Sequence, residues 1–216
     1  MLQVWNLKVI KKLINQKKII KELITKDSKL EKIFDTPKQC PFFAEPLMKE
    51  EVLFFELAQS IVGQQISAKA AEAIWKRIIF SSKNKKEFLN FMSNSKLKWA
   101  RQQGLSEKKY EYIKSLANKI ITQELSLVLT ANLSDKEAIK FLSSFRGVGP
   151  WTAEMFLMFA YKRLDIFSIG DIALRKAISD IYNVNKDDFK KILQISNNWK
   201  PYRSVVCWYL WEYLGV

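Results

Sequence analysis

The feature that most constrains the fold is the turn at residues 145–152, which separates two stretches of helical periodicity. Gly147 and Gly149 allow positive φ angles and a close approach of the backbone. Pro150 suits the first turn of a helix, because the N–H that it lacks would have no partner there. The segment therefore predicts two helices joined by a tight hairpin. The free amides at the start of the second helix are a ready site for an anion.

Apolar residues recur at helical spacing along most of the chain, which predicts an all-α protein. Ser67, Ser106 and Ser134 are the expected helix N-caps, the last in a capping box with Glu137. Residues 39–46 are expected to form a connection, and residues 125–130 coil or a single helical turn. The expected helices cover residues 7–14, 23–34, 53–63, 67–78, 83–91, 96–103, 106–121, 134–141, 150–161, 171–181, 186–195 and 201–214.

The charge balance points toward a polyanionic partner. The chain has 36 Lys and Arg against 22 Asp and Glu, a net charge of +14. Such a surplus favours nucleic acid and makes its binding dependent on salt. Most of the basic residues are lysine, so on composition alone a bias of codon usage stays open as the alternative. The hairpin favours nucleic-acid phosphate as the anion.

Composition also excludes several kinds of site. The chain has no histidine, which excludes imidazole bases and histidine metal ligands. Cys40 and Cys207 are too few for a four-cysteine iron–sulfur cluster, and a reduced compartment fits them. No apolar run reaches 18 residues, so we expect no membrane partner. Lysines interrupt the apolar residues of the first twenty positions, which favours an amphipathic helix there over a signal peptide.

Four segments in order resemble the helix-hairpin-helix and Gly-Pro-Asp signature of base-excision DNA glycosylases. Two of them, at 61–67 and 199–204, are similar to the alkylated-base branch, the 3-methyladenine DNA glycosylase II family. The other two are the hairpin at 142–154 and the segment 167–171 that ends in Asp171. The resemblance runs from about residue 50 to the C-terminus.

The resemblance implies two helical lobes with an active-site cleft between them. Residues 51–163 would form the central lobe, which ends in the helix-hairpin-helix. Residues 1–50 and 164–216 would together form the terminal lobe, which carries the catalytic aspartate. The implied activity is monofunctional hydrolysis of the N-glycosidic bond of alkylated purines of the 3-methyladenine type. The nucleotide is first flipped out of the duplex, and an abasic site remains.

Asp171 is the catalyst that the resemblance implies. Its carboxylate would stabilise positive charge on the sugar and orient water, and a cationic base leaves neutral without a general acid. From the residues alone, Asp171 is a standard N-cap for a helix that begins at Ile172. The two roles are compatible. Gly170 stands where some relatives have a second aspartate.

The resemblance places Trp151, Trp211 and Met155 around the flipped base. The indole faces of the two tryptophans would attract a cationic purine by stacking and cation–π interaction. For Met155, a role in the core stays open as the alternative. The resemblance places an intercalating wedge residue, which occupies the space that the flipped nucleotide leaves in the duplex, at Gln65. Gln64 is the alternative. A polar loop at a helix end is the simpler explanation of both glutamines.

The implied phosphate contacts come from Gly147, Gly149 and Thr152, with Arg146 as a charged candidate. Family members also bind a monovalent cation, Na⁺ or K⁺, through hairpin carbonyls, which here belong to Ser143, Phe145 and Val148. No other cofactor is expected, and no iron–sulfur cluster.

Trp151 stands where bifunctional members carry a lysine that forms a Schiff base, so no lyase activity is expected. The expected partner is duplex DNA that contains damaged bases, bound by a monomer. The expected location is the bacterial cytoplasm, with the nucleoid, or the nucleus of a eukaryote. Two alternatives stay open: a glycosylase for oxidised or deaminated bases, and a non-catalytic helix-hairpin-helix protein that binds DNA.

Overall fold

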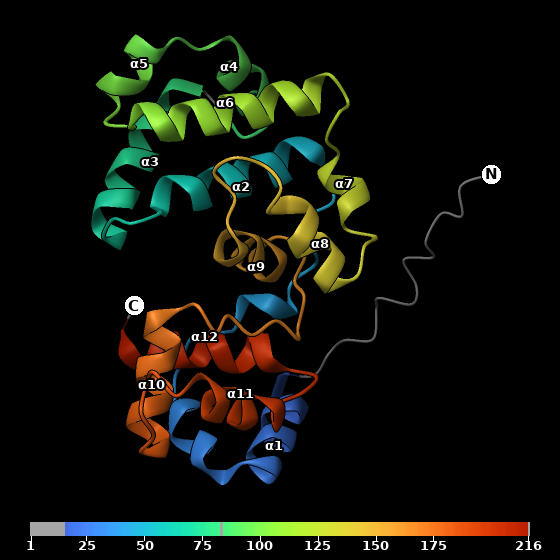
Figure 1. Cartoon of the computed structure of the whole chain (residues 1–216), viewed down its shortest axis with the longest axis vertical. Coiled ribbons are helices and arrows are strands. Elements are labelled where there is room, and N and C mark those ends of the chain that lie inside the picture. The colour runs from blue at the N-terminus through green and yellow to red at the C-terminus, as the bar shows by residue number, and fades with distance from the viewer. Residues whose placement is uncertain (1–15, 83, 216) are drawn as a thin grey trace, which may run out of the picture.

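The computed structural model describes residues 16–82 and 84–215, and in these residues all regular structure is helical (Figure 1). The predicted all-α fold is confirmed, while the predicted helix at 7–14 lies outside the described residues. None of the described helices is long and apolar enough to cross a membrane. The α-helices are Gln16–Lys26 (α1), Glu50–Gly63 (α2), Ala68–Ser82 (α3), Phe88–Asn94 (α4), Leu97–Gln102 (α5), Glu107–Ile121 (α6), Leu127–Thr130 (α7), Asp135–Leu142 (α8), Pro150–Phe159 (α9), Ile172–Tyr182 (α10), Phe189–Asn197 (α11) and Arg203–Leu214 (α12), with 3₁₀ helices at Ser28–Ile33 (η1) and Pro41–Phe43 (η2).

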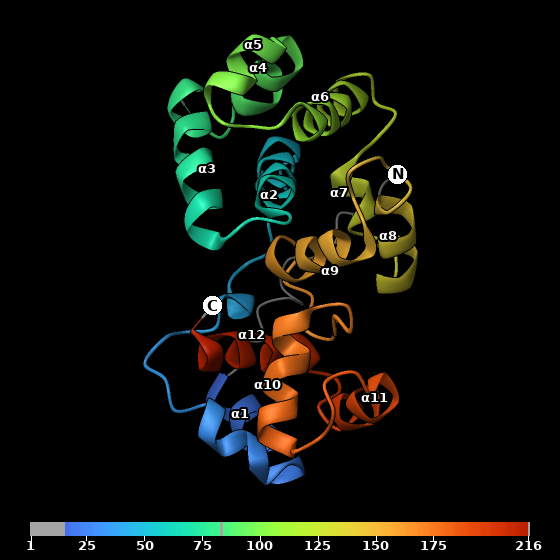
Figure 2. The same ribbon diagram turned by 60° about the vertical axis from the view of Figure 1, so that its left-hand side comes forward.

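The helices gather into two groups, which Figures 1 and 2 show at opposite ends of the molecule. Helices α2 to α9 form one group. Helix α1, which comes early in the chain, lies at the other end with α10, α11 and α12. The first 3₁₀ helix, η1, contacts both α1 and α12, and so joins segments far apart in sequence. The domain boundaries expected near residues 50 and 164 stay predictions.

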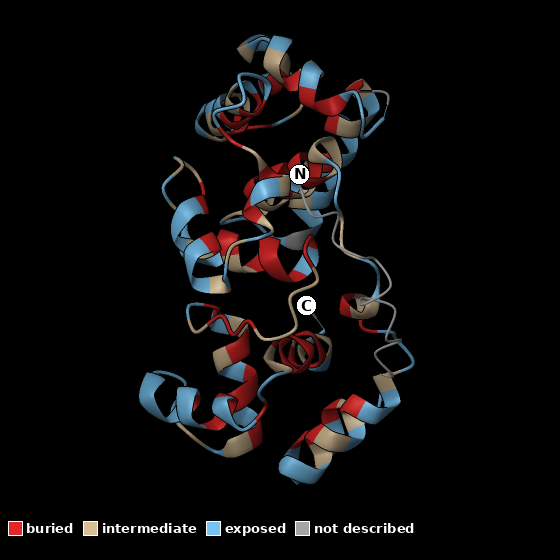
Figure 3. Cartoon of the chain, turned by 90° about the vertical axis from the view of Figure 1, so that its right-hand side faces the viewer, coloured by how far each residue is buried: buried red, intermediate tan, exposed pale blue. Residues whose placement is uncertain are grey.

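Each group is built around one helix that is buried on several sides. Helix α2 packs against α3, α4, α6, α7 and α9, and its residues from Leu53 to Val62 are mostly buried. Helix α12 is buried continuously from Ser204 to Leu210. A helix that is apolar on most of its circumference belongs inside a bundle. In Figure 3 the buried residues accordingly follow the interior of both groups.

Side-chain caps set several helix starts as predicted. The hydroxyl oxygen of Ser106 accepts from the Lys109 amide, and Ser134 forms the expected capping box with Glu137. The Ser67 hydroxyl accepts from the Ala70 amide at the start of α3. These bonds satisfy amides that the first turn of a helix leaves without partners.

Two predicted helices are wrong in their extent. The helix expected over 23–34 is divided at Asp27, whose carboxylate accepts from the Lys29 amide and starts the separate helix η1. The helix expected from residue 83 begins only at Phe88, because the Asn84 side chain accepts from the amides of Lys86 and Glu87. In both places a short polar side chain competes with helical hydrogen bonding.

The hairpin between α8 and α9 depends on a glycine beside an aromatic ring. Gly147 has φ +88°, and a Cβ atom built there would lie 2.3 Å from Cδ2 of Tyr112 on α6. Gly149 has φ −82°, and a Cβ atom there would meet no atom within 4 Å. The two glycines of the motif therefore meet different constraints.

We expect Gly147→Ala to lower the free energy of unfolding by roughly 2 kcal/mol or more, measured by urea or thermal unfolding. A left-handed backbone costs an alanine roughly 1–2 kcal/mol, and forcing a methyl group into packed atoms adds roughly 1–3 kcal/mol. Gly149→Ala is the matched control, with an expected change within about 0.5 kcal/mol. Equal losses in the two variants would contradict the role given to the Tyr112 ring.

Candidate active site

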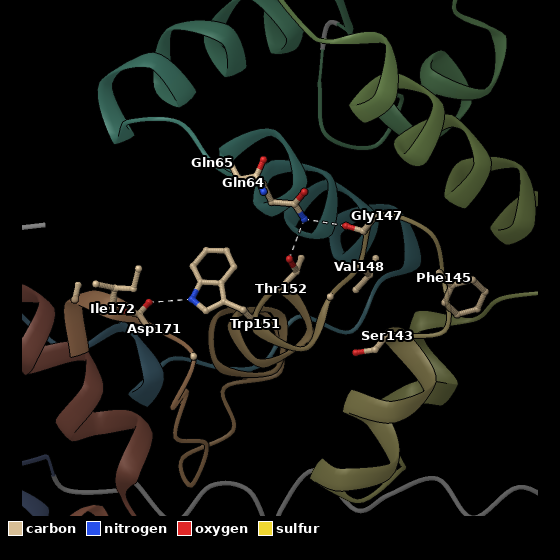
Figure 4. Close-up of a pocket in the computed structure, with 13 residues that line it drawn as sticks. Gln64, Gln65, Ser143, Phe145, Gly147, Val148, Trp151, Thr152, Asp171 and Ile172 are labelled. Carbon is tan, nitrogen blue, oxygen red and sulfur yellow. Dashed lines mark hydrogen bonds between the residues drawn. The ribbon is translucent and has the colours of Figure 1, made fainter. Parts of the chain in front are cut away.

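A cavity of about 800 Å³ opens where the two groups of helices face each other. Three segments line it: the loop after α2, the hairpin with the start of α9, and residues 170–173 at the start of α10. Figure 4 shows these segments converging from different parts of the chain. The predicted wedge, cation and catalytic residues, and the predicted phosphate residues other than Arg146, are thus brought to one cavity, although up to about a hundred residues of chain separate them.

Asp171 lies in this cavity, and its carboxylate is held by three N–H donors. Oδ1 accepts from the Leu174 amide at 2.9 Å, so the predicted N-cap is confirmed. Oδ2 accepts from Nε1 of Trp151 at 2.9 Å, and Nε1 of Trp211 lies 3.5 Å from Oδ1. The residue is only 9 % exposed. None of the ion pairs in the described part of the chain involves this carboxylate, so neutral donors hold it.

The predicted base-pocket residues occupy three different environments. Trp151 lines the cavity, is 38 % exposed, and directs its indole N–H toward Asp171 (Figure 4). Trp211 contacts the same carboxylate and stacks on Phe159 with ring centroids 6.0 Å apart. Met155 is buried in α9. Only Trp151 of the three lines the cavity, and the assignment of the other two to a base pocket stays a prediction.

The two glutamines after α2, which the sequence does not distinguish, lie in different environments. Nε2 of Gln64 donates to the Gly147 carbonyl at 2.8 Å and to Oγ1 of Thr152 at 2.9 Å. Gln65 is exposed and has φ +57°. Figure 4 shows the hydrogen bonds from Gln64 to the hairpin. Gln64 is therefore engaged within the protein, whereas the side chain of Gln65 faces solvent.

The hairpin presents backbone groups to the cavity. Helix α9 starts after Gly149 without a side-chain cap, which leaves the amides of its first turn available to an anion. Gly147, Gly149 and Thr152 all line the cavity. The guanidinium of Arg146 is exposed and lies 5.9 Å from the centroid of the Tyr112 ring.

The carbonyls predicted to bind a cation belong to three residues that also line the cavity: Ser143, Phe145 and Val148. The hydroxyl of Ser143 is buried and has no hydrogen-bond partner among the described residues. The Phe145 carbonyl accepts from the Val148 amide at 3.1 Å, which leaves it a second lone pair. The Ser143 hydroxyl oxygen and the Phe145 carbonyl oxygen thus keep lone pairs that a further partner could use, and the cation site stays a prediction.

A second carboxyl group, Glu154 on α9, lies behind the site and was not predicted. Oγ of Ser168 donates to Oε2 of Glu154, and the Ser168 carbonyl accepts from the Asp171 amide at 3.1 Å. Burial raises the pKa of Glu154, the Ser168 hydrogen bond opposes that rise, and the negative charge of Asp171 adds to it. Glu154 does not line the cavity. Its sequence position gave no signal, because the contact depends on the loop before α10.

Sequence reasoning also missed two residues of α6, Lys109 and Tyr112, which contact the loop after α2 and the hairpin respectively. Ile172 was noted only as the start of a helix, yet it lines the cavity and is 66 % exposed. An apolar residue at a helix start beside a charged candidate could have drawn attention to Ile172. Nothing local distinguishes Lys109 from the many other lysines.

Comparison with known proteins agrees with this geometry. Residues 58–201 match the family model described as HhH-GPD superfamily base excision DNA repair protein. DNA-3-methyladenine glycosylase 1 of Schizosaccharomyces pombe is 30 % identical over 171 residues, which are 76 % of this chain and 74 % of the relative. The DNA-3-methyladenine glycosylase of Bacillus subtilis is 30 % identical over 216 residues, 91 % of this chain and 71 % of that one.

Solved structures extend the likeness to three dimensions. The Schizosaccharomyces pombe 3-methyladenine DNA glycosylase in complex with abasic DNA has a TM-score of 0.77 and 25 % identity, covering 92 % of this chain and 97 % of that one. A DNA-3-methyladenine glycosidase from Bacillus halodurans has a TM-score of 0.71 and 31 % identity, covering 90 % and 88 %. The matched segment includes the cavity, the hairpin and Asp171. The chain belongs to the HhH-GPD superfamily of base excision DNA repair proteins.

Proposed function

We propose that the protein is a monofunctional DNA glycosylase that removes alkylated purines of the 3-methyladenine type from duplex DNA. One observation carries the proposal: the buried carboxylate of Asp171 lies in a cavity that is lined by the hairpin between α8 and α9 and by Trp151. The free amides of that hairpin suit a phosphate group. The names of the similar proteins support the substrate class. The activity also requires a nucleotide flipped from the duplex, because the bond to be cut lies inside the base stack.

The carboxylate of Asp171 supplies the negative charge that this reaction needs. As the bond between C1′ and the base nitrogen breaks, positive charge develops on the sugar, and a nearby carboxylate stabilises it. Water then forms the new bond to C1′ and gives up a proton, which the carboxylate can accept. A purine with formal positive charge takes the bonding electrons and leaves neutral. One carboxylate therefore suffices, without a histidine or a second acid.

The indoles of Trp151 and Trp211 support this role in two ways. Their N–H groups fix the carboxylate oxygens, and their electron-rich faces attract a cationic base. Met155 follows Trp151 by one helical turn on α9 and is buried, so we propose that it supports this wall from behind. The enzyme would then select damaged bases by their positive charge and by the weakness of their glycosidic bond.

The remaining residues of the cavity are proposed to hold DNA. The uncapped amides at the start of α9 suit a phosphate, and Arg146 adds charge beside them. Gln65 is proposed as the wedge, because Gln64 is already bonded to the hairpin. A Na⁺ or K⁺ ion held by carbonyls of Ser143, Phe145 and Val148 would add positive charge near a phosphate.

We expect Asp171→Asn to lower the release of 3-methyladenine from methylated duplex DNA by at least about 10²-fold, the usual scale for a catalytic acid or base. Asparagine is also a good N-cap, so α10 should keep its start. Affinity for a duplex with an abasic-site analogue, measured by fluorescence anisotropy, should be retained. A parent protein that binds this duplex but releases no base would favour the non-catalytic alternative.

The matched control is Glu154→Gln, which neutralises the carboxyl group that lies behind the cavity. Its rate of base release should stay close to that of the parent protein. If both variants lose activity equally, negative charge in the region matters rather than Asp171 itself. Duplexes with 7-methylguanine, hypoxanthine or 8-oxoguanine, assayed beside 3-methyladenine, separate the proposed substrate from deaminated and oxidised bases.

Glu154→Gln should also change the pH dependence of stability. The pKa of Glu154 in the folded protein is raised above its ordinary value of 4.5, so ionisation of this group opposes folding. The melting temperature of the variant relative to the parent should therefore be lowest below about pH 4, where the carboxyl is mostly protonated in both states, and should rise as the pH increases and the carboxyl of the parent ionises. A difference that does not change with pH would contradict the raised pKa.

Trp151 cannot form a Schiff base, so borohydride reduction during turnover should trap no covalent complex with DNA. The measurement is gel electrophoresis of protein and labelled damaged duplex after reduction, with a known bifunctional glycosylase as the positive control. A trapped adduct of this protein would contradict the monofunctional assignment.

A further inference from the structure

Helix α6 contacts both of the loops that the proposed function assigns to DNA. Lys109 and Tyr112 are three residues apart, so they lie on one face of the helix. Lys109 reaches the loop after α2, while the ring of Tyr112 lies against Gly147 in the hairpin. Gln64 joins the two loops directly by its bonds to Gly147 and Thr152.

Lys109 binds the end of α2. Its Nζ donates to the carbonyl oxygens of Val62 at 2.9 Å and Gln64 at 2.7 Å. The last carbonyls of a helix have no partners within the helix, and the dipole favours a cation there. Lys109 is half-buried, and burial lowers the pKa of its amine. The ammonium is thus directed into the protein, unlike that of a solvated surface lysine.

The bond to Gln64 bears directly on Gln65. The carbonyl of Gln64 and the amide of Gln65 belong to one planar peptide group, so fixing the oxygen fixes the plane. Gln65 follows with φ +57°, a left-handed conformation that residues other than glycine adopt rarely. Such a conformation persists where its surroundings hold it.

We propose that Lys109 is a positioning residue for base flipping. By binding the carbonyl oxygens of Val62 and Gln64, it fixes the peptide before Gln65 and so holds that side chain ready to enter the duplex. Lys109 acts through the loop and does not contact the DNA. The inference rests on the proposed role of Gln65 as the wedge.

The test measures wedge insertion separately from catalysis. The probe is a duplex that carries an abasic-site analogue next to 2-aminopurine, whose fluorescence rises when a side chain disrupts its stacking. At saturating protein, Gln65→Ala should reduce this rise. Lys109→Met, which keeps the length of the stem and removes the charge, should lower the equilibrium constant for insertion by roughly tenfold, as expected for loss of hydrogen bonds to a charged group.

Three further measurements separate positioning from other roles. The double variant should be no worse than Gln65→Ala, because the two residues act in one step. The dependence of DNA affinity on salt should be unchanged in Lys109→Met, whereas loss of a phosphate contact would reduce the slope by about 0.9. Lys108→Met is the matched control, since Lys108 is the exposed neighbour on α6, and its signal should equal that of the parent.

The outcomes distinguish the two levels of the proposal. If Gln65→Ala leaves the fluorescence unchanged, the wedge assignment fails, and the role of Lys109 fails with it. If Gln65→Ala lowers the signal but Lys109→Met does not, only the positioning role is overturned. A reduced salt slope would overturn it in favour of a phosphate contact. If Lys109→Met does not fold, Lys109→Gln, which keeps an N–H donor, is expected to give an intermediate signal, and a signal equal to the parent's would overturn the proposal.

Discussion

The hydrogen bond between Nε1 of Trp151 and Oδ2 of Asp171 is the interaction on which the site depends. It joins α9, in one group of helices, to the start of α10, in the other. The Leu174 amide and the Trp211 indole hold the other oxygen. Neutral donors hold the orientation of this carboxylate, and no lysine or arginine among the described residues forms an ion pair with it. That charge is what a developing oxocarbenium ion requires.

The rest of the fold brings three distant loops to this carboxylate. The core helices α2 and α12 are each buried among their neighbours, so their ends are fixed in space. The loop after α2 and the hairpin are then tied together through Gln64 and supported by α6. Groups that act on one nucleotide must keep their geometry to within a fraction of an ångström, and buried helices provide that rigidity.

Much of the fold could be predicted, because it depends on local chemistry. Helical periodicity, the serine caps at Ser106 and Ser134 and the glycine-proline turn act within a few residues. The errors arose where a side chain competed with the helix, at Asp27 and Asn84. The candidate catalyst was found through its motif, and its N-cap role through its position before a helix. The contacts of Glu154 and Lys109 were not predictable, because each is made with another segment of the chain that only the fold brings near. Ile172 lines the cavity simply because it follows Asp171, and its apolar side chain at a helix start was a local signal.

The sequence by itself determined that the chain is helical, basic and free of histidine, and that a glycine-proline hairpin precedes a lone aspartate. These properties follow from residue types and short spacings. Only the tertiary structure decided that Gln64 is bonded within the protein while Gln65 is exposed, and that Trp151 rather than Met155 lines the cavity. The physical reason is that hydrogen bonding and burial depend on which surfaces meet, and adjacent residues with the same side chain can meet different ones.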